Sequence, residues 1–99
     1  MITVREGEKR EIIAGVTKRG GGTFTLTSPQ MRILTATRQV AVDWASCSWD
    51  PAASELFGVF DSTLAQTSAT GTYFVQLRGT IANELYGYEV EVRLLDWGP

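Results

Sequence analysis

The chain has 99 residues, of which 43% are hydrophobic and 20% are charged, and its formal net charge is −2. A chain of this length buries roughly 65% of the surface that its unfolded form exposes, which is enough for one two-layer core. It contains one cysteine, Cys47, and no histidine, so an intrachain disulfide, the common zinc sites and every histidine-dependent nucleophile are excluded. We therefore expect one domain over residues 1–99, no metal or other cofactor, and no enzymatic activity.

Short segments in which apolar and polar residues alternate follow one another along the chain, and none has a helical period. Gly20 to Gly22 is expected to be a flexible connection, Ser28-Pro29 to break the third strand, and Asp50-Pro51 to form a turn. Residues 62–70 are expected to form a polar loop that Leu64 plugs. The predicted strands cover residues 2–5, 10–16, 23–27, 31–37, 40–49 (with a bulge), 56–60, 71–79 and 86–94.

Residues 71–95 predict one long β-hairpin, with residues 81–85 as its connection. Side chains alternate along a strand, so each arm has one apolar face and one polar face. In the first arm Tyr73, Val75 and Leu77 share a face, and Gln76 and Arg78 take the other. One buried face and one wet face are typical of antiparallel sheets. In the second arm the apolar face carries Tyr86, Tyr88, Val90, Val92 and Leu94, and the charged face carries Glu89, Glu91 and Arg93.

Seven or eight short strands at roughly ten-residue spacing indicate an all-β fold. The expected architecture is an antiparallel β-sandwich with an immunoglobulin-like topology, and a small β-barrel is the alternative. The side chains expected to point into the core are Val4, Ile12, Phe24, Leu26, Ile33, Val42, Tyr73, Val75, Leu77, Tyr88, Val90 and Val92.

Three tryptophans are the principal candidates for an interface. Trp44 and Trp49 are separated by an odd number of residues, so in a regular strand they point to opposite faces, one into the core and one outward. Trp97 follows the last predicted strand and is expected to fold over the sheet edge or to dock onto a neighbour. An exposed indole can anchor a protein interface or stack on a sugar ring, and the first interpretation is preferred.

Charge is distributed unevenly along the chain. Residues 1–49 carry seven Lys/Arg and four Asp/Glu (net +3), whereas residues 50–99 carry two and seven (net −5). Arg10 and Arg19 belong to the basic residues near the ends of the early strands, and we include them among the candidate interface residues. Opposite patches can orient self-association or contact with another protein; the alternative is that the charges only keep the surface soluble. The pI of 5.0 argues against a nucleic-acid partner.

Glu89 and Glu91 form a carboxylate pair on the predicted wet face, with Cβ atoms about 7 Å apart. Glycosidases use such pairs, but they require a cleft and one raised pKa. Gln76, Arg78 and Arg93 are expected as cross-strand neighbours, so a solvated, ion-paired sheet face is the preferred interpretation. The aspartates are too scattered for a calcium loop, and residues 19–23 lack the ending of a phosphate-binding loop.

Residues 1–6 lack the apolar run of a signal peptide, and no stretch approaches the ~18 consecutive apolar residues of a membrane span. We therefore expect synthesis in the cytoplasm, which is compatible with later incorporation into a virion. A membrane partner and a small-molecule ligand are not expected.

The chain has a short basic strand after Met1, then the element Phe24-Thr25-Leu26-Thr27, and finally Gly71-Thr72-Tyr73 with the β-branched hairpin that follows it through Val92. The order of these elements resembles that of small phage and prophage structural modules, in particular the immunoglobulin-like domains of phage baseplate and tail proteins. The resemblance implies a non-enzymatic structural or assembly role in such a particle, with no catalytic residue. A carbohydrate-binding module that uses exposed tryptophans and a carboxylate enzyme that uses Glu89 and Glu91 are the alternatives.

Overall fold

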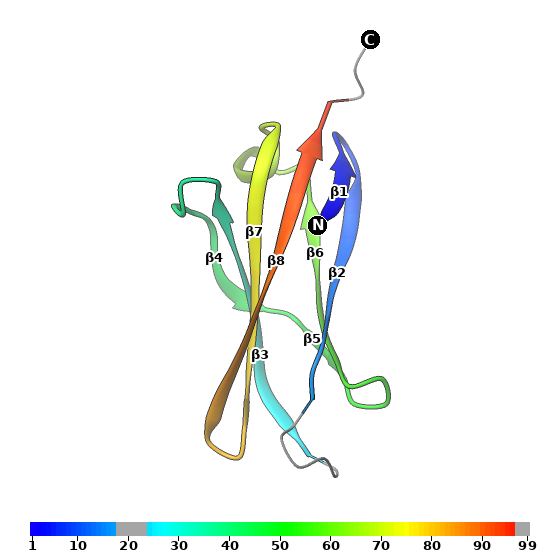
Figure 1. The fold of residues 1–99 in the computed structure, drawn as a ribbon, viewed down its shortest axis with the longest axis vertical. Helices are drawn as coiled ribbons and strands as arrows, with labels where there is room; N and C mark the ends of the chain where they lie inside the picture. Colours follow the sequence, from blue (N-terminus) through cyan, green and yellow to red (C-terminus); the bar gives the residue numbers. More distant parts are fainter. Residues whose placement is uncertain (18–23, 97–99) are drawn as a thin grey trace.

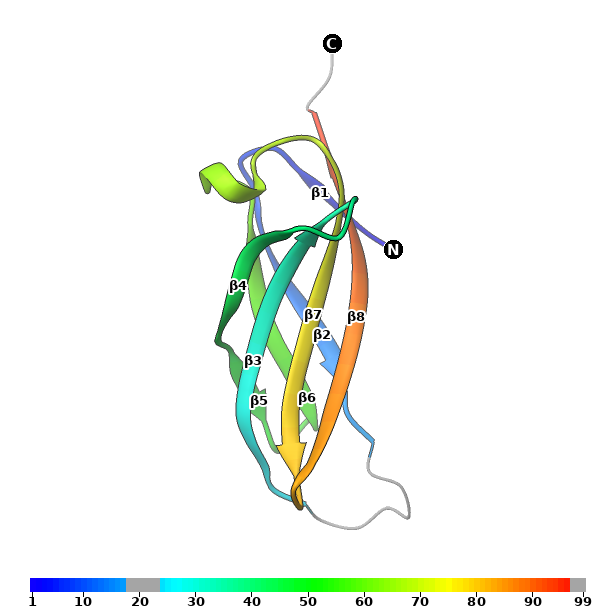
Figure 2. The same cartoon turned by 90° about the vertical axis from the view of Figure 1, so that its left-hand side faces the viewer.

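The computed structural model describes residues 1–17 and 24–96, whose strands form two facing sheets (Figure 1). The five-stranded sheet has the order β1-β8-β7-β3-β4 and the three-stranded sheet the order β2-β6-β5. Figure 2 looks onto the five-stranded sheet, with the three-stranded sheet behind it. The all-β prediction is confirmed, whereas a small barrel would need one closed sheet. The elements are β1 Ile2–Arg5, β2 Lys9–Gly15, β3 Leu26–Thr35, β4 Val40–Ser46, β5 Ser48–Asp50, β6 Glu55–Asp61, the short 3-10 helix η1 Ala65–Thr67, β7 Gly71–Ile81 and β8 Glu84–Leu95.

The core lies between the two sheets, where apolar side chains from both of them meet. Ile12 of β2 and Phe60 of β6 are fully buried, as are Leu77 of β7 and Val92 of β8. Burying a large apolar side chain contributes about 1.5–3 kcal/mol to folding, so this layer is the main source of stability. The predicted inward set is confirmed: all its members are buried except four that are partly buried and pack against the same cluster, namely Phe24, Val42, Tyr88 and Val90.

The β7–β8 hairpin is longer than predicted, because both strands continue to the turn itself. Ile81 pairs with Glu84, so only Ala82 and Asn83 connect the arms, instead of residues 81–85. Both connecting residues have positive φ, 49° for Ala82 and 65° for Asn83, as a type I′ hairpin turn requires. Asparagine tolerates this conformation better than alanine does, and no Asn-Gly or Asp-Gly pair marks the turn in the sequence.

β1 departs from the antiparallel prediction. It lies parallel to the last strand, with Ile2 opposite Val92 and Val4 opposite Leu94. The chain then turns at residues 6–8 and continues as β2 in the other sheet. Parallel neighbours do not share a hairpin, so the alternation within each strand predicts which residues are buried but not this pairing.

Ser28-Pro29 does not end a strand, contrary to the prediction. β3 runs through both residues, and its register with β7 shifts between Thr27 and Gln30. Ser28 has φ of 53°, so the chain forms a bulge here instead of a break. A bulge leaves a residue outside the ladder, which accommodates a proline that has no N–H to donate. The expected flexible connection at Gly20 to Gly22 lies outside the described residues.

The predicted strand over residues 40–49 divides between the two sheets. β4 pairs with β3 in the five-stranded sheet, and β5 pairs with β6 in the three-stranded sheet. Cys47 lies at the crossing, where its N–H donates to the Pro29 carbonyl at 3.0 Å. Its side chain is half-buried and packs against the core, and this burial raises the pKa of the thiol. Cys47 therefore acts as a small apolar residue.

The loop between β6 and β7 is closed by hydroxyl groups and not by Leu64, which is 45% exposed. Thr67 is fully buried, and its hydroxyl donates to the Asp61 carbonyl. Ser62 is also buried and donates to the Glu8 carbonyl at 2.6 Å. The prediction of an apolar plug was wrong because these short polar side chains satisfy the buried backbone carbonyls directly.

Gly79→Ala is expected to lower the free energy of unfolding by about 1–3 kcal/mol through overpacking. A Cβ at residue 79 would meet the Leu26 side chain, with Cγ at 2.7 Å. The matched control is Gly87→Ala on the paired strand, where nothing lies within 4 Å of the Cβ position and a gain of roughly 0.5–1 kcal/mol is expected. Urea denaturation followed by tryptophan fluorescence measures both variants. Equal stabilities would contradict the close approach of Leu26 to Gly79.

Candidate functional site

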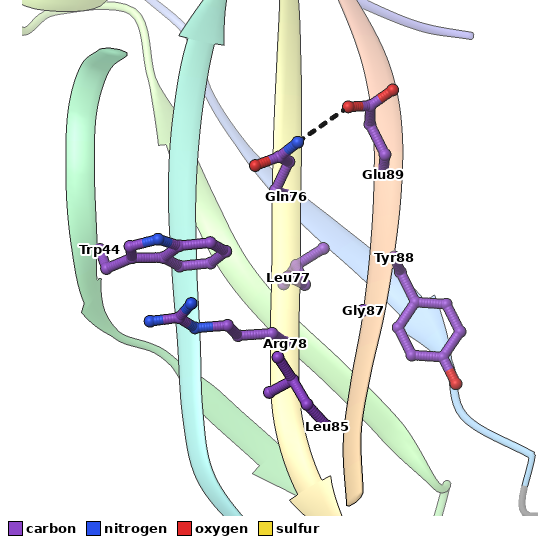
Figure 3. A pocket seen from close by; sticks show the side chains of 8 residues that line it. All are labelled: Trp44, Gln76, Leu77, Arg78, Leu85, Gly87, Tyr88 and Glu89. Carbon is purple, nitrogen blue, oxygen red and sulfur yellow. Dashed lines mark hydrogen bonds between the residues drawn. The ribbon is translucent and has the colours of Figure 1, made fainter.

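The outer face of the five-stranded sheet carries a tryptophan stacked with two arginines. The guanidinium carbon of Arg78 lies 3.7 Å from the centroid of the Trp44 ring, and that of Arg32 lies 4.7 Å from it. Figure 3 shows Trp44 reaching from β4 across β3, directly beside Arg78 of β7. We call this surface the Trp44 face; it comprises Arg32, Trp44, Gln76, Arg78, Leu85, Gly87 and Glu89.

Irregular pairing of β4 places Trp44 on this face. Met31 pairs with Ala45 and Ile33 with Val42, so two residues of β4 lie opposite the single residue Arg32 of β3. Such an extra residue bends a strand and redirects its side chains. The indole therefore packs against the arginine side chains instead of projecting into solvent.

Amide side chains orient both guanidinium groups without neutralising them. Arg32 donates through Nε and Nη2 to Oε1 of Gln76 at 2.8 and 2.6 Å. Arg78 donates through Nε to Oε1 of Gln30 at 3.0 Å. Over residues 1–17 and 24–96, the ion pairs are Lys9–Asp61 and Arg38–Glu89. Arg32 and Arg78 therefore present their positive charges without a carboxylate partner within that part of the chain.

A hollow of about 310 Å³ opens beside this stack. Trp44 and Arg78 border it on one side, Leu85 closes one end, and Gln76 and Glu89 close the other (Figure 3). Gly87 lies in its lining, and the space where its side chain would project is open. Without a side chain at this residue, the backbone is open to close approach by another molecule. Leu85 is 66% exposed, so the rim offers an apolar contact beside two cations.

Glu89 is engaged in an ion pair on the same face. Arg38 Nη2 donates to its Oε2 at 3.1 Å, and Gln76 Nε2 donates to its Oε1 at 3.0 Å. These hydrogen bonds hold the pKa of Glu89 below its ordinary range, which is opposite to the raised pKa that a general acid needs. The prediction that Gln76 neighbours Glu89 is confirmed, but the cation is Arg38, whereas Arg78 pairs across the strands with Gly87 and Arg93 with Thr72.

The other predicted interface residues lie elsewhere. Trp49 is partly buried on the inner side of β5, where it packs against the core and lies 5.8 Å from the Phe24 ring. Trp44 and Trp49 thus point to opposite faces as predicted. Arg10 is exposed on β2, with Nη1 3.5 Å from the Thr3 carbonyl. The remaining two candidates, Arg19 and Trp97, lie outside the described residues.

Sequence reasoning missed Arg32, Arg38 and Arg78 as members of a site. The hydrogen-bond partners of Arg32 and Arg38 lie 44 and 51 residues away in the sequence. No local sequence pattern therefore identifies these two arginines. The available signal was that Gln30, Arg32, Gln76 and Arg78 occupy every second position on the polar sides of two strands. Such alternation predicts a shared outer face only once the pairing of β3 with β7 is known.

Three further observations describe the chemistry of the described residues. No three acidic or cysteine side chains in the described ranges come together to hold a metal ion. Two guanidiniums lie over the Trp44 ring, where a carbohydrate-binding module would stack a sugar. The structure over those same ranges has no helix with the length and apolar character needed to cross a membrane.

No family model, curated protein or experimentally determined structure matches the chain.

Glu89→Gln is expected to lower stability at neutral pH and to have no effect in acid. The pairing holds the pKa of Glu89 below its ordinary value of 4.5, so its stabilising contribution is present above that pH and is lost as the pH falls through the folded-state pKa. The effect is small because the pair is solvent-exposed. Urea midpoints of both proteins between pH 7 and pH 3 measure it.

The matched control is Glu91→Gln, which removes a carboxylate from the same strand face that has no ion pair within the described residues. Its urea midpoint is expected to differ less from that of the parent at pH 7. A Glu89→Gln deficit that persists unchanged at pH 3 would show that the side chain acts through packing instead of charge.

Proposed function

We propose that this protein is a non-enzymatic structural or assembly module that binds a protein partner through the Trp44 face. The observation that carries this proposal is the stack of Trp44 with Arg32 and Arg78, whose charges are oriented but not neutralised. Tryptophan and arginine are the residues most enriched among those that dominate binding energy at interfaces. The adjacent hollow over Gly87 gives a partner side chain a place to insert.

We further propose that the fold is an immunoglobulin-like sandwich. The order β8-β7-β3-β4 corresponds to strands G, F, C and C′ of a variable-type domain, and β2-β6-β5 corresponds to B, E and D. Tyr73, near the start of β7, donates its hydroxyl to the Ala69 carbonyl at 2.6 Å, as the tyrosine corner of that fold does. Val75 stands where antibody domains carry a cysteine, so apolar packing takes the place of the disulfide.

The proposed setting is a phage or prophage particle, as the resemblance to baseplate and tail domains implies. Particles of this kind are built from repeated copies that contact one another through their surfaces. Two features support an assembly role: the outer strand edges of β4 and β5, which have no partner strand among the described residues, and the exposed apolar side chains on both sheets. Assembly is one way to cover such edges and patches.

Arg78→Glu is expected to weaken association at least about tenfold, because it reverses a charge at the centre of the proposed interface. Light scattering after size exclusion, over a range of protein and salt concentrations, measures the association. The parent protein should associate more strongly at low salt, since salt screens exposed charges. A parent that stays monomeric under all conditions would contradict assembly through copies of this chain.

Arg10→Glu is the comparison variant, because it makes the same charge change at the edge of β2, away from Trp44. It is expected to associate as the parent does. Loss of association in Arg10→Glu but not in Arg78→Glu would place the interface at the β1–β2 edge instead.

A further inference from the structure

The outer face of the three-stranded sheet carries an exposed apolar patch. Side chains alternate along β2 and β6, so Ile12 and Phe60 enter the core while Ile13 and Val59 point outward. Ile13 is 44% exposed and Val59 is 49% exposed. Phe57 lies opposite Ile13 in the ladder and is half-buried. We call this surface the Ile13 face; it comprises Glu11, Ile13, Asp50, Glu55, Phe57 and Val59.

Acidic residues surround this patch. Glu11 lies opposite Val59, and Glu55 lies opposite Asp50 at the other end of the face. The carboxylate of Asp61, on the same side of β6, is paired with Lys9 at 3.9 Å. Glu11, Glu55 and Asp50 have no ion pair within residues 1–17 and 24–96. The Ile13 face is therefore apolar at its centre and negative at its rim.

We propose that the Trp44 face of one copy binds the Ile13 face of a second copy; this inference rests on the proposed assembly function. The two faces are complementary in charge, since Arg32 and Arg78 lack carboxylate partners on one and Glu11 and Glu55 lack cationic partners on the other. They are also complementary in form. The hollow over Gly87 can receive an apolar side chain of the kind that Ile13 and Val59 present.

The two-layer fold makes this contact repeatable. The outer faces of two stacked sheets point in opposite directions, so a copy bound on one face leaves its other face free. Such head-to-tail contacts produce a ring when the rotation closes and a filament when it does not. A self-paired contact centred on Trp44 would instead bring four guanidinium groups together, and like charges disfavour that arrangement.

The molecule has enough surface for both contacts. A stable interface buries about 800 Å² on each partner, and the chain exposes 5981 Å². Two interfaces per copy would therefore cover roughly a quarter of the surface.

Mixing two face-specific variants tests the proposal. Arg78→Glu disables the Trp44 face and keeps the Ile13 face, whereas Ile13→Arg does the reverse. Each variant alone is expected to be a monomer of 10.9 kDa. An equimolar mixture should form a dimer of twice that mass and grow no further. In that dimer the intact Ile13 face of Arg78→Glu binds the intact Trp44 face of Ile13→Arg, and no second pair of intact faces remains. Sedimentation velocity of each variant and of the mixture measures the species.

Gly87→Val provides a second variant of the Trp44 face that leaves every hydrogen bond of Arg78 in place. The new side chain fills the hollow from a position where a Cβ meets nothing within 4 Å, so the variant is expected to fold. Like Arg78→Glu, it is expected to be a monomer alone and to form a dimer when mixed with Ile13→Arg. Far-ultraviolet circular dichroism confirms that all three variants keep their strands.

The outcomes separate the inference from the proposed function. A parent that never associates overturns this inference and assembly through copies of this chain, but not binding of a different protein through the Trp44 face. A parent whose association survives in Ile13→Arg and is lost in Arg78→Glu overturns only this inference, since the Trp44 face would then pair with itself or with another surface. Two monomeric variants whose mixture stays monomeric overturn it as well. Dimers that form only in the mixture support it.

Discussion

The register of the β7–β8 hairpin is the constraint on which the other features depend. Its two-residue turn sets Ile81 against Glu84 and thereby aligns the whole ladder as far as Gly71 and Leu94. A slip of one residue would exchange the faces of a strand, moving Val75 out of the core and Gln76 into it. The same ladder aligns β3 on one side and β1 on the other, so both the core and the Trp44 face follow from a single turn.

Irregular pairing in the neighbouring strands gives the outer face of the five-stranded sheet a layer of stacked arginine and aromatic side chains. The shifted pairing of β4 places Trp44 over Arg32 and Arg78, and the guanidinium of Arg38 lies 4.3 Å from the centroid of the Phe74 ring. Leu34, which points to this outer side of β3, is only 4% exposed although it lies outside the main cluster of buried side chains between the sheets. Each cation–aromatic contact of this kind contributes about 0.5–2 kcal/mol. The layer thus adds rigidity to the outer face of the five-stranded sheet.

The alternation of apolar and polar residues was enough to predict the strands and the inward side chains, because burial on one face imposes a period of two. The alternation did not predict the structure at positions where the chain departs from a period of two. The bulge at Ser28, the turn at Ala82 and the change of sheet at Cys47 depend on backbone geometry that other parts of the fold impose. The candidate site was predicted in part: Trp44 was one of the candidate anchors, and Gln76 was expected beside Glu89. Its stack was not predicted, because the arginines meet Trp44 through strand pairing and not through proximity in the sequence.

The charge asymmetry seen in the sequence takes a different form in the folded protein. Counted along the chain, the first half is basic and the second half acidic. Counted by sheet, Arg32 and Arg78 come from different halves yet share one outer face, and Glu11 and Glu55 likewise share the other. Folding therefore sorts charge across the thickness of the molecule instead of along its sequence. For a two-layer domain this matters because opposite faces can meet copies or partners at the same time, whereas opposite halves of a chain need not be separated in space at all.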